Sequence, residues 1–481
     1  MILQSVLWCL APLLIALLLI SVLWPEQTRQ WYSFPLKLCF AVGVGFGLLS
    51  CVYFLGLSFW GPSRTRLLWT QLALLVILIA VLLYRRRTPN RGLADARTPE
   101  VSIERIAKSG FSRFASVLFV IALISAAVTL VFISLKKPHG DWDAWAVYNM
   151  KARFLFRGGA QWKDLFSQPM EWSGPDYPLL IPTAIAACWT LMGTETLVIP
   201  ALVAILFTLA TVGIAAFCVS VLRGSLQGSL AGLVLLGTPY LVTHGADQYS
   251  DIPIGFFFLA TLALIHLHDQ FSNGDCRFLV LAGLMAGLAA WTKNEGLLFM
   301  IAVVVSRFAV LVPRIGLKPY LREMRFLASG LLPILLVVIY FKLTISAHSG
   351  LLFPPEGPNF IAKLTNLWRY WTIFDYFVGR GLGFGNWPSP VVPLLAFYLL
   401  LLGIGIGDNQ KRAIAGSLMA LGIMLTGYFM IYVLSPRDLD WHLVTSLDRL
   451  YSQLWPSFIF VFFLTVRTPE QVLAKKEPVG A

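Results

Sequence analysis

Charged residues are scarce in this chain of 481 residues. They make up 13% of the sequence, whereas hydrophobic residues make up 58%. Soluble domains carry roughly 25% charged residues, so the composition excludes a soluble enzyme on a single anchor and indicates an integral membrane protein. The apolar runs are continuous over about 17–25 residues and do not alternate over about 10, which favours helices over the strands of a barrel.

Acidic residues and cysteines are also few. The chain has 24 Asp and Glu against 37 Lys and Arg, a formal net charge of +13. In a membrane protein such an excess marks cytoplasmic loops, so nucleic-acid binding is not indicated. The six cysteines form no CxxC pair and five of them lie in apolar runs, so the sequence predicts neither a metal site nor a disulfide framework. No internal repeat is evident.

The apolar runs predict an all-α, polytopic membrane protein with about 13 transmembrane helices. The first run, Ile2 to Trp24, has no preceding Lys or Arg and exceeds the roughly 7–15 apolar residues of a signal peptide, so it is interpreted as a span. The expected spans lie at 4–24, 35–57, 66–84, 114–135, 196–222, 226–243, 252–268, 278–292, 296–312, 326–346, 389–407, 413–434 and 454–466.

Basic residues orient these spans. The segment 85–113 is the longest basic one and is therefore expected in the cytoplasm, which places the residues after 135 outside. Leu179–Met192 is short and contains Pro182. Treating it as an interfacial or re-entrant helix puts every remaining basic loop inside. Polar residues then gather outside, in 136–194, 244–251, 346–388, 435–453 and the hairpin Thr292–Glu295.

The predicted organisation has five parts. They are an N-terminal three-span module (1–84), a basic cytoplasmic loop (85–113), a membrane core (114–346), an external loop (347–388), and C-terminal spans with a short basic tail (389–481). Interfacial helices are expected in the first long external loop of the core.

Acids and cations share the external face. Asp141 and Asp143 stand between aromatic residues where a span ends, and Asp251 precedes another span. Lys293 and Arg449 lie in other external segments. A carboxylate can take a proton from an acceptor hydroxyl, and a cation can hold a phosphate leaving group. Together these residues suit transfer of a group from a lipid phosphate.

Five motifs in this order resemble the GT-C superfamily of membrane glycosyltransferases, near the protein O-mannosyltransferases and lipid A aminoarabinose transferases. They are Asp143 to Gly159 (DAWAVYNMKARFLFRGG), Asp176 to Leu180 (DYPLL), a span that ends at Arg223, Asp251 with Pro253, and Gly283 to Lys293 (GLMAGLAAWTK). Three details depart from the family: Asp-Trp-Asp-Ala-Trp replaces the usual Asp-Glu pair, Leu179 stands where a second Pro is common, and Asn294 replaces a Gly. Acceptor identity therefore does not carry over.

The resemblance implies inverting transfer of a sugar from a polyprenyl phosphate to an extracytoplasmic glycan, lipid or protein, at the outer face of a bacterial inner membrane. It makes Asp143 the general base or acceptor-orienting acid, with Asp141 as its rival and Asp251 as a second carboxylate. Lys293 and Arg449 would bind the donor phosphate. Acceptor contacts would come from Asp247, Tyr177 and Arg153. The expected partners are the lipid-linked donor and membrane lipid.

Other interpretations stay open for the same residues. Asp251 could cap the helix that follows it, and Lys293 could be an interfacial lysine that reaches for water. Arg449 could pair with Asp448 or Asp440. No cofactor is required, and a divalent cation held by Asp143 and Asp251 is left open. A transporter or flippase is the alternative function, although such proteins tend to place charges mid-span in two related halves, and neither feature is evident.

Overall fold

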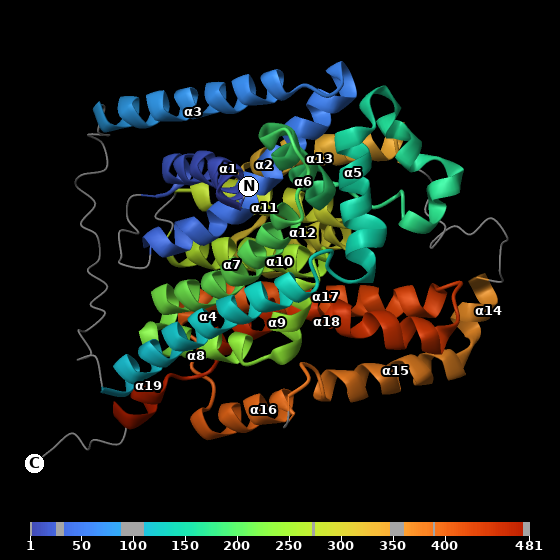
Figure 1. The fold of residues 1–481 in the computed structure, drawn as a ribbon. Coiled ribbons are helices and arrows are strands. Elements are labelled where there is room, and N and C mark those ends of the chain that lie inside the picture. Colours follow the sequence, from blue (N-terminus) through green and yellow to red (C-terminus); the bar gives the residue numbers. More distant parts are fainter. Residues whose placement is uncertain are drawn as a thin grey trace, which may run out of the picture.

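The computed structural model describes residues 2–25, 33–87, 110–271, 275–346, 360–387 and 390–474. Within these ranges the regular structure is helical, as expected, apart from one isolated bridge between Ile404 and Val466 (Figure 1). Nine helices of the described chain are long and apolar enough to cross a membrane, or ten if the bent pair α8–α9 counts as one span. The protein is therefore a multi-pass membrane protein.

The long apolar helices are α1 (Ile2–Leu23), α2 (Ser33–Trp60), α3 (Arg64–Arg87), α4 (Gly110–Lys136), α7 (Val198–Arg223), α10 (Asp251–Phe271), α12 (Glu295–Ile315), α13 (Leu317–Thr344) and α17 (Lys411–Leu434). Three apolar helices are shorter, α6 (Leu180–Met192), α11 (Arg277–Thr292) and α16 (Val391–Leu402). The predicted number of about 13 spans is not confirmed, because the segments expected at 278–292 and 389–407 form helices of only 16 and 12 residues.

Helix α10 lies at the centre of the bundle. Its apolar window is 100% buried, and it packs against α7, α11 and α18 (Leu439–Thr465). Beside it α11 and α13 cross closely, since a Cβ atom on Gly283 would lie 1.9 Å from the carbonyl oxygen of Leu327, and one on Gly330 would lie 1.9 Å from that of Val280. Small residues let helix backbones approach in this way inside a membrane.

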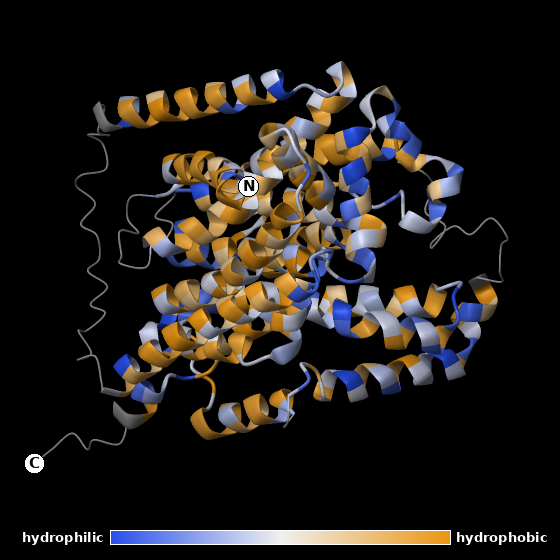
Figure 2. Ribbon diagram, viewed as in Figure 1, coloured by the Kyte–Doolittle hydropathy of each residue, from blue (hydrophilic) through white to orange (hydrophobic). Residues whose placement is uncertain are grey.

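The N-terminal helices differ in their burial. The apolar window of α2 is 72% buried within the bundle, and the Trp291 indole of α11 donates a hydrogen bond of 2.8 Å to the Ser50 hydroxyl of α2. By contrast, only 6% of the window of α3 is buried, and Figure 1 shows this helix along the outside of the bundle. Figure 2 shows that most residues of this helix are hydrophobic. The proposed boundary at residue 84 stays a prediction.

Ion pairs occupy both ends of α10. At one end Asp251 is fully buried, and at the other Asp269 accepts a hydrogen bond of 2.8 Å from Arg307 of α12. The same guanidinium donates to Glu323 of α13 at 2.6 Å and is only 3% exposed. A helix of 21 residues is about 30 Å long, so the two networks lie at opposite faces of the bundle.

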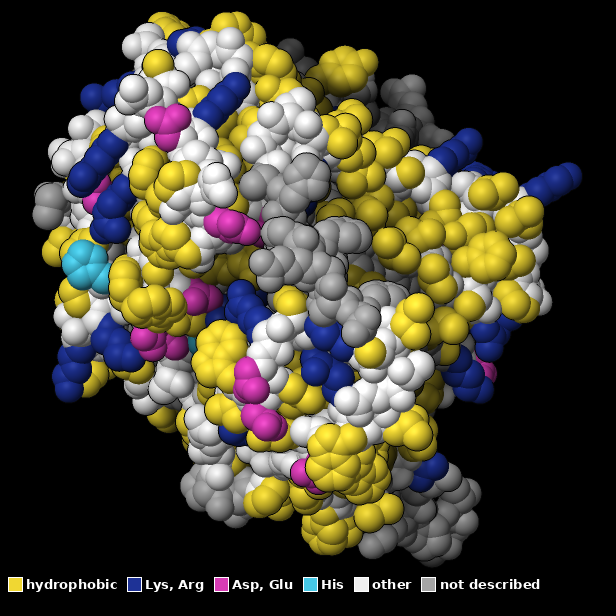
Figure 3. All heavy atoms as spheres, turned by 90° about the vertical axis from the view of Figure 1, so that its right-hand side faces the viewer, with side chains coloured by type: hydrophobic (Ala, Val, Ile, Leu, Met, Phe, Trp, Pro, Cys, Tyr) yellow, Lys and Arg dark blue, Asp and Glu magenta, His cyan; other side chains and the backbone are white. Residues whose placement is uncertain are grey.

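The end of the bundle that begins with Asp251 carries most of the non-spanning structure. After α4 the chain forms a π-helical turn η2 (Ala144–Tyr148), α5 (Asn149–Arg157), and the 3-10 helices η3 (Gly159–Phe166) and η4 (Gln168–Ser173). Helices therefore form in the first long external loop as expected, and their place at a membrane interface stays a prediction. Figure 3, which views this end, shows acidic and basic side chains interspersed with hydrophobic ones.

Three expected segments differ from the structure. Helix α6 is more buried than an interfacial helix would be, since nearly every residue lies inside the protein, and its re-entrant placement stays a prediction. Residues 360–382 of the predicted external loop form α14 (Phe360–Thr365) and α15 (Leu367–Leu382), and residues 347–359 lie outside the described chain. The predicted loop 435–453 is mostly the first half of α18. The remaining short helices are α8 (Ser225–Leu236), α9 (Pro239–Ala246) and α19 (Pro469–Ala474).

Candidate functional site

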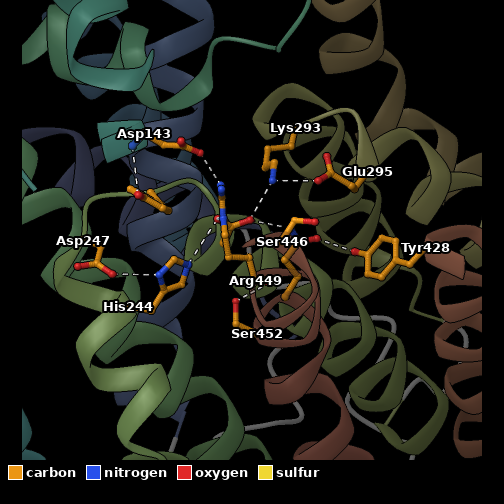
Figure 4. A network of polar contacts seen from close by, with 12 residues as sticks. Asp143, His244, Asp247, Lys293, Glu295, Tyr428, Ser446, Arg449 and Ser452 are labelled. Carbon is orange, nitrogen blue, oxygen red and sulfur yellow. Dashed lines mark hydrogen bonds and ion pairs between the residues drawn. The ribbon is translucent and has the colours of Figure 1, made fainter. Parts of the chain in front are cut away.

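The buried carboxylate of Asp251 organises a polar network at the start of α10 (Figure 4). Its Oδ1 accepts hydrogen bonds from Lys293 Nζ at 2.9 Å and from Gln453 Nε2 at 2.7 Å. Its Oδ2 accepts one from Arg449 Nε at 3.0 Å and lies 3.5 Å from His244 Nε2. A buried charge requires partners of this kind. Because Asp251 is 0% exposed and fully engaged, it anchors the network and does not face incoming molecules.

Asp143 is the accessible carboxylate of the network. It stands immediately before η2, its side chain is 24% exposed, and its Oδ2 lies 2.7 Å from an Arg449 terminal nitrogen. Its backbone N–H donates to the Tyr249 hydroxyl at 3.1 Å, and the Arg449 guanidinium lies 4.7 Å from the centre of that ring. Arg449 therefore bridges a buried acid and an accessible acid, two contacts that a planar guanidinium can make at once.

Lys293, between α11 and α12, is the second cation. Its Nζ lies 2.9 Å from Asp251 Oδ1 and 2.9 Å from Glu295 Oε1. Burial disfavours its charged form, but the two carboxylates outweigh burial and hold the pKa of Lys293 well above its ordinary value. Lys293 is thus a fixed positive charge.

The hydroxyl of Tyr148 lies close to this charge cluster. Burial raises the pKa of Tyr148, and the nearby Lys293 opposes that effect. The side chain is only 1% exposed, and its hydroxyl makes no hydrogen bond to the described protein. A buried hydroxyl without a partner costs free energy, so Tyr148 is an unsatisfied donor inside the protein, beside the charge cluster.

Ionic groups in the network nearly balance. Three carboxylates (Asp143, Asp251 and Glu295) face two cations, and each cation contacts two of the carboxylates. Arg449 occupies the position between Asp143 and Asp251 where a divalent cation was considered. No group of three or more His, Cys, Asp or Glu in the described ranges is arranged to hold a metal ion. Metal dependence stays untested.

Two of the remaining predicted acids lie beside the network. Asp247 Oδ2 lies 3.2 Å from His244 Nδ1, so it contacts Asp251 only through the imidazole ring. Asp141 is half exposed, and its Oδ2 lies 3.5 Å from Lys137 Nζ. The structure therefore brings Asp143, and not Asp141, to Arg449.

Arg153 pairs away from Arg449, whereas Tyr177 packs beside the network, against the cluster that contains Tyr148. Arg153 Nε donates to Glu195 at 2.7 Å, which ties α5 to the segment before α7. The Tyr177 ring lies 5.6 Å from the buried amine of Lys151. Burial lowers the pKa of Lys151 to about 7. Their proposed acceptor contacts stay predictions.

Asn294, which replaces the Gly usual in the related family, has a clear structural role. Its Nδ2 donates to Asp176 Oδ2 at 2.8 Å, and its Oδ1 accepts from Lys342 Nζ at 2.8 Å. Lys342 also donates to the backbone carbonyl of Asp176. Asn294 therefore fixes the hairpin that carries Lys293 against the segment before α6.

Sequence reasoning missed His244, Gln453 and Tyr249 as members of the network. Gln453 follows Arg449 by four residues, which is one turn of α18, but the helix was expected to begin only after both. The alternative pairing of Arg449 is not found, since Asp448 instead lies 3.2 Å from Arg380.

Comparisons with known proteins support the predicted resemblance. Residues 176–341 match the family model described as dolichyl-phosphate-mannose-protein mannosyltransferase. This match, which includes Asp251 and Lys293, confirms the resemblance of the region to GT-C membrane glycosyltransferases. No curated protein matches the chain.

Among solved structures, the chain resembles ArnT from Cupriavidus metallidurans bound to undecaprenyl phosphate, with 17% sequence identity and a TM-score of 0.44. The match covers 72% of this chain and 59% of that one, so the chain spans less than two thirds of ArnT.

Proposed function

We propose that the protein is an inverting glycosyltransferase that moves a sugar from a polyprenyl phosphate to an extracytoplasmic acceptor, at the outer face of a bacterial inner membrane. The observation that carries the proposal is Arg449, which joins the accessible acid Asp143 to the buried pair of Asp251 and Lys293. One acid is placed to take a proton, and two cations are placed beside it to receive an anion.

Location and sequence similarity support this proposal. The network stands at one end of the bundle, beside α5 and the short helices η2 to η4, and such an end suits a reaction between a lipid headgroup and a water-soluble group. The matched family model supports sugar transfer, and the name of that family specifies a lipid-phosphate donor. The identities of the donor and the acceptor of this protein are part of what we propose.

The reaction would need three roles. Asp143 accepts the proton of an acceptor hydroxyl as that oxygen forms a bond to the anomeric carbon of the donor sugar. The bond between that carbon and the phosphate oxygen breaks, and the polyprenyl phosphate leaves with the electron pair. Attack opposite the leaving group inverts the anomeric centre. Arg449 and Lys293 stabilise the negative charge that develops on the phosphate.

Donor binding would also activate the base. In the free protein Asp143 Oδ2 is held 2.7 Å from Arg449. Asp251 holds the same guanidinium from the buried side. A phosphate that binds the exposed edge of the guanidinium competes with Asp143 but not with Asp251. Binding therefore releases the Asp143 carboxylate beside the sugar, which favours an order in which the donor binds first.

The test is turnover of radiolabelled polyprenyl-phosphate sugars by the protein in lipid nanodiscs, with membrane extracts as the source of acceptor. Wild type should transfer or slowly hydrolyse one donor, and the turnover rate of Asp143→Asn should be at least about 100-fold lower. Asp440→Asn is the matched control, because Asp440 is an exposed acid at the same end of the bundle. Equal turnover by wild type and Asp143→Asn would remove Asp143 from the mechanism. No turnover of any donor would favour a transporter.

A further inference from the structure

Two tryptophans stand exposed on the turn that carries Asp143. Trp142 is 61% exposed and Trp145 is 44% exposed, and their ring centroids lie 4.5 Å apart at an interplanar angle of 72°. Together they form an aromatic surface at the edge of the charged network. Exposed aromatic patches bordered by polar groups commonly mark binding sites.

The backbone that presents these indoles is fixed. Gly140 has φ +74°, and a Cβ atom there would lie 2.5 Å from the backbone oxygen of Asp247. The same oxygen accepts a hydrogen bond of 3.1 Å from the Asp141 N–H. The Trp142 N–H donates to the Asp141 carboxylate at 2.8 Å. A surface that is rigid before binding loses less entropy when a ligand arrives.

Polar side chains border the aromatic surface. Lys137 and Asp141 form an ion pair of 3.5 Å in which each side chain is about half exposed. An open hollow beside them is lined by Lys137, Pro138, His139, Gly140 and Trp145. Lys137 Nζ also lies 3.9 Å from Asp247 Oδ1, and Asp141 Oδ1 accepts from the Trp142 N–H. Exposed ion pairs contribute little to stability, so the amine and Asp141 Oδ2 can exchange their mutual contact for hydrogen bonds to a ligand.

We propose that this surface, formed by Lys137, His139, Asp141, Trp142 and Trp145 and named here the tryptophan platform, binds a hexose unit of a carbohydrate acceptor. A pyranose ring has an apolar face of C–H groups that packs on an indole, and hydroxyls at its edge that bond to a carboxylate, an amine or an imidazole. The platform offers both chemistries on one rigid turn.

The location of the platform fits an acceptor site, and this part of the inference rests on the proposed function. Asp143 follows Trp142 directly, and its carboxylate points to Arg449. A glycan held by one hexose on the platform would therefore extend its neighbouring units along the turn that carries the proposed base. Glycan acceptors are thus favoured over lipid and protein acceptors that carry no sugar.

The competing interpretation is an aromatic belt, because tryptophans collect at membrane interfaces without any ligand. A belt residue needs neither a fixed backbone nor a neighbouring carboxylate. Trp371 of α15 provides a matched comparison, since it is also 61% exposed but packs beside an apolar residue, Phe374.

The test is binding of the full-length protein, in nanodiscs, to an array of oligosaccharides that contain neutral hexose, N-acetylhexosamine or deoxyhexose units. Wild type should bind a subset of them, and Trp142→Ala and Trp145→Ala should each weaken binding at least tenfold. Trp371→Ala should bind like wild type. Asp141→Asn, a substitution at an exposed position, should weaken binding severalfold and is the second variant if an alanine variant fails to fold.

Three results would overturn the platform. They are no binding by wild type above empty nanodiscs, full binding by the folded Trp142, Trp145 and Asp141 variants, or an equal loss in Trp371→Ala. Donor hydrolysis, measured in parallel, separates this inference from the proposed function. Hydrolysis without glycan binding rejects the platform alone, whereas glycan binding without turnover of any donor rejects the glycosyltransferase and leaves the platform.

Discussion

The substitution Asp251→Asn tests whether the buried carboxylate holds the network together. Asparagine keeps the size of the side chain and an acceptor oxygen, but it removes the negative charge between Lys293 and Arg449. Removing one partner of a buried ion pair costs about 3–5 kcal/mol. Here Lys293 keeps Glu295 and Arg449 keeps Asp143, so we expect a loss near the lower limit, about 3 kcal/mol.

The free energy of unfolding can be measured by titrating SDS into mixed micelles and following helicity by circular dichroism. Thr261→Val is the matched control on the same helix, because its buried hydroxyl donates only to the Phe257 carbonyl of α10. The Thr261→Val substitution should lower the free energy of unfolding by less than about 1 kcal/mol.

A double-mutant cycle sharpens the same prediction. Lys293→Met alone should also destabilise the protein, because it leaves Asp251 and Glu295 with fewer cations. If the pair acts as proposed, the double variant should be more stable than the sum of the two single losses predicts, by at least about 1 kcal/mol. Additive losses, or a loss below about 1 kcal/mol in Asp251→Asn, would refute the anchoring role.

The remaining predictions address the guanidinium, a buried lysine and a helix crossing. Arg449→Lys should lower kcat/KM about 100-fold or more, because one amine cannot reproduce the bidentate bridge; turnover near wild type would contradict this. The pKa of Lys151 is about 7 in the folded protein, below its value in the unfolded chain. Between pH 7 and about 10 the unfolded state therefore binds more protons than the folded state. The free energy of unfolding of the wild type should rise with pH in this range, relative to that of Lys151→Met. In SDS titrations the difference in free energy of unfolding between wild type and Lys151→Met should increase by about 1.4 kcal/mol per pH unit. A difference that does not change with pH would contradict the lowered pKa of Lys151. Gly283→Ala should cost about 2 kcal/mol or more, because its Cβ would overlap the Leu327 carbonyl, whereas Gly416→Ala, which meets no atom within 4 Å, should be nearly neutral in the same titration.

Much of the site could be predicted because its charges are rare. In a chain with so few acids, the position of each one relative to the spans is informative, and counting basic loops was enough to place Asp143, Asp251, Lys293 and Arg449 at one face. The structure brings these four residues into one network. The bend of 63° between α8 and α9 also has a local signal, since Pro239 begins the second helix.

The rest depended on contacts that no local pattern specifies. Gln453 bonds to Asp251 from 202 positions along the chain, and its amide carries no charge to mark it. The start of α18 at Leu439 was missed because the polar residues of its first half resemble a loop in a hydropathy profile, although buried residues such as Leu443 and Leu447 anchor this half of the helix. Likewise α6 is too short for a span, and its burial arises from neighbours that fold around it.

The ion pairs at the two ends of α10 have a consequence for motion. Asp251 is tied to α18 and to the hairpin between α11 and α12, and Asp269 is tied to α12 and, through Arg307, to α13. Sliding or tilting α10 would separate buried charges at both membrane faces at once, and each separation is costly. Alternating access by rigid-body rocking around this helix is therefore disfavoured. Motion during a reaction cycle is instead expected in side chains at the end of the bundle, such as the Asp143 carboxylate that pairs with Arg449.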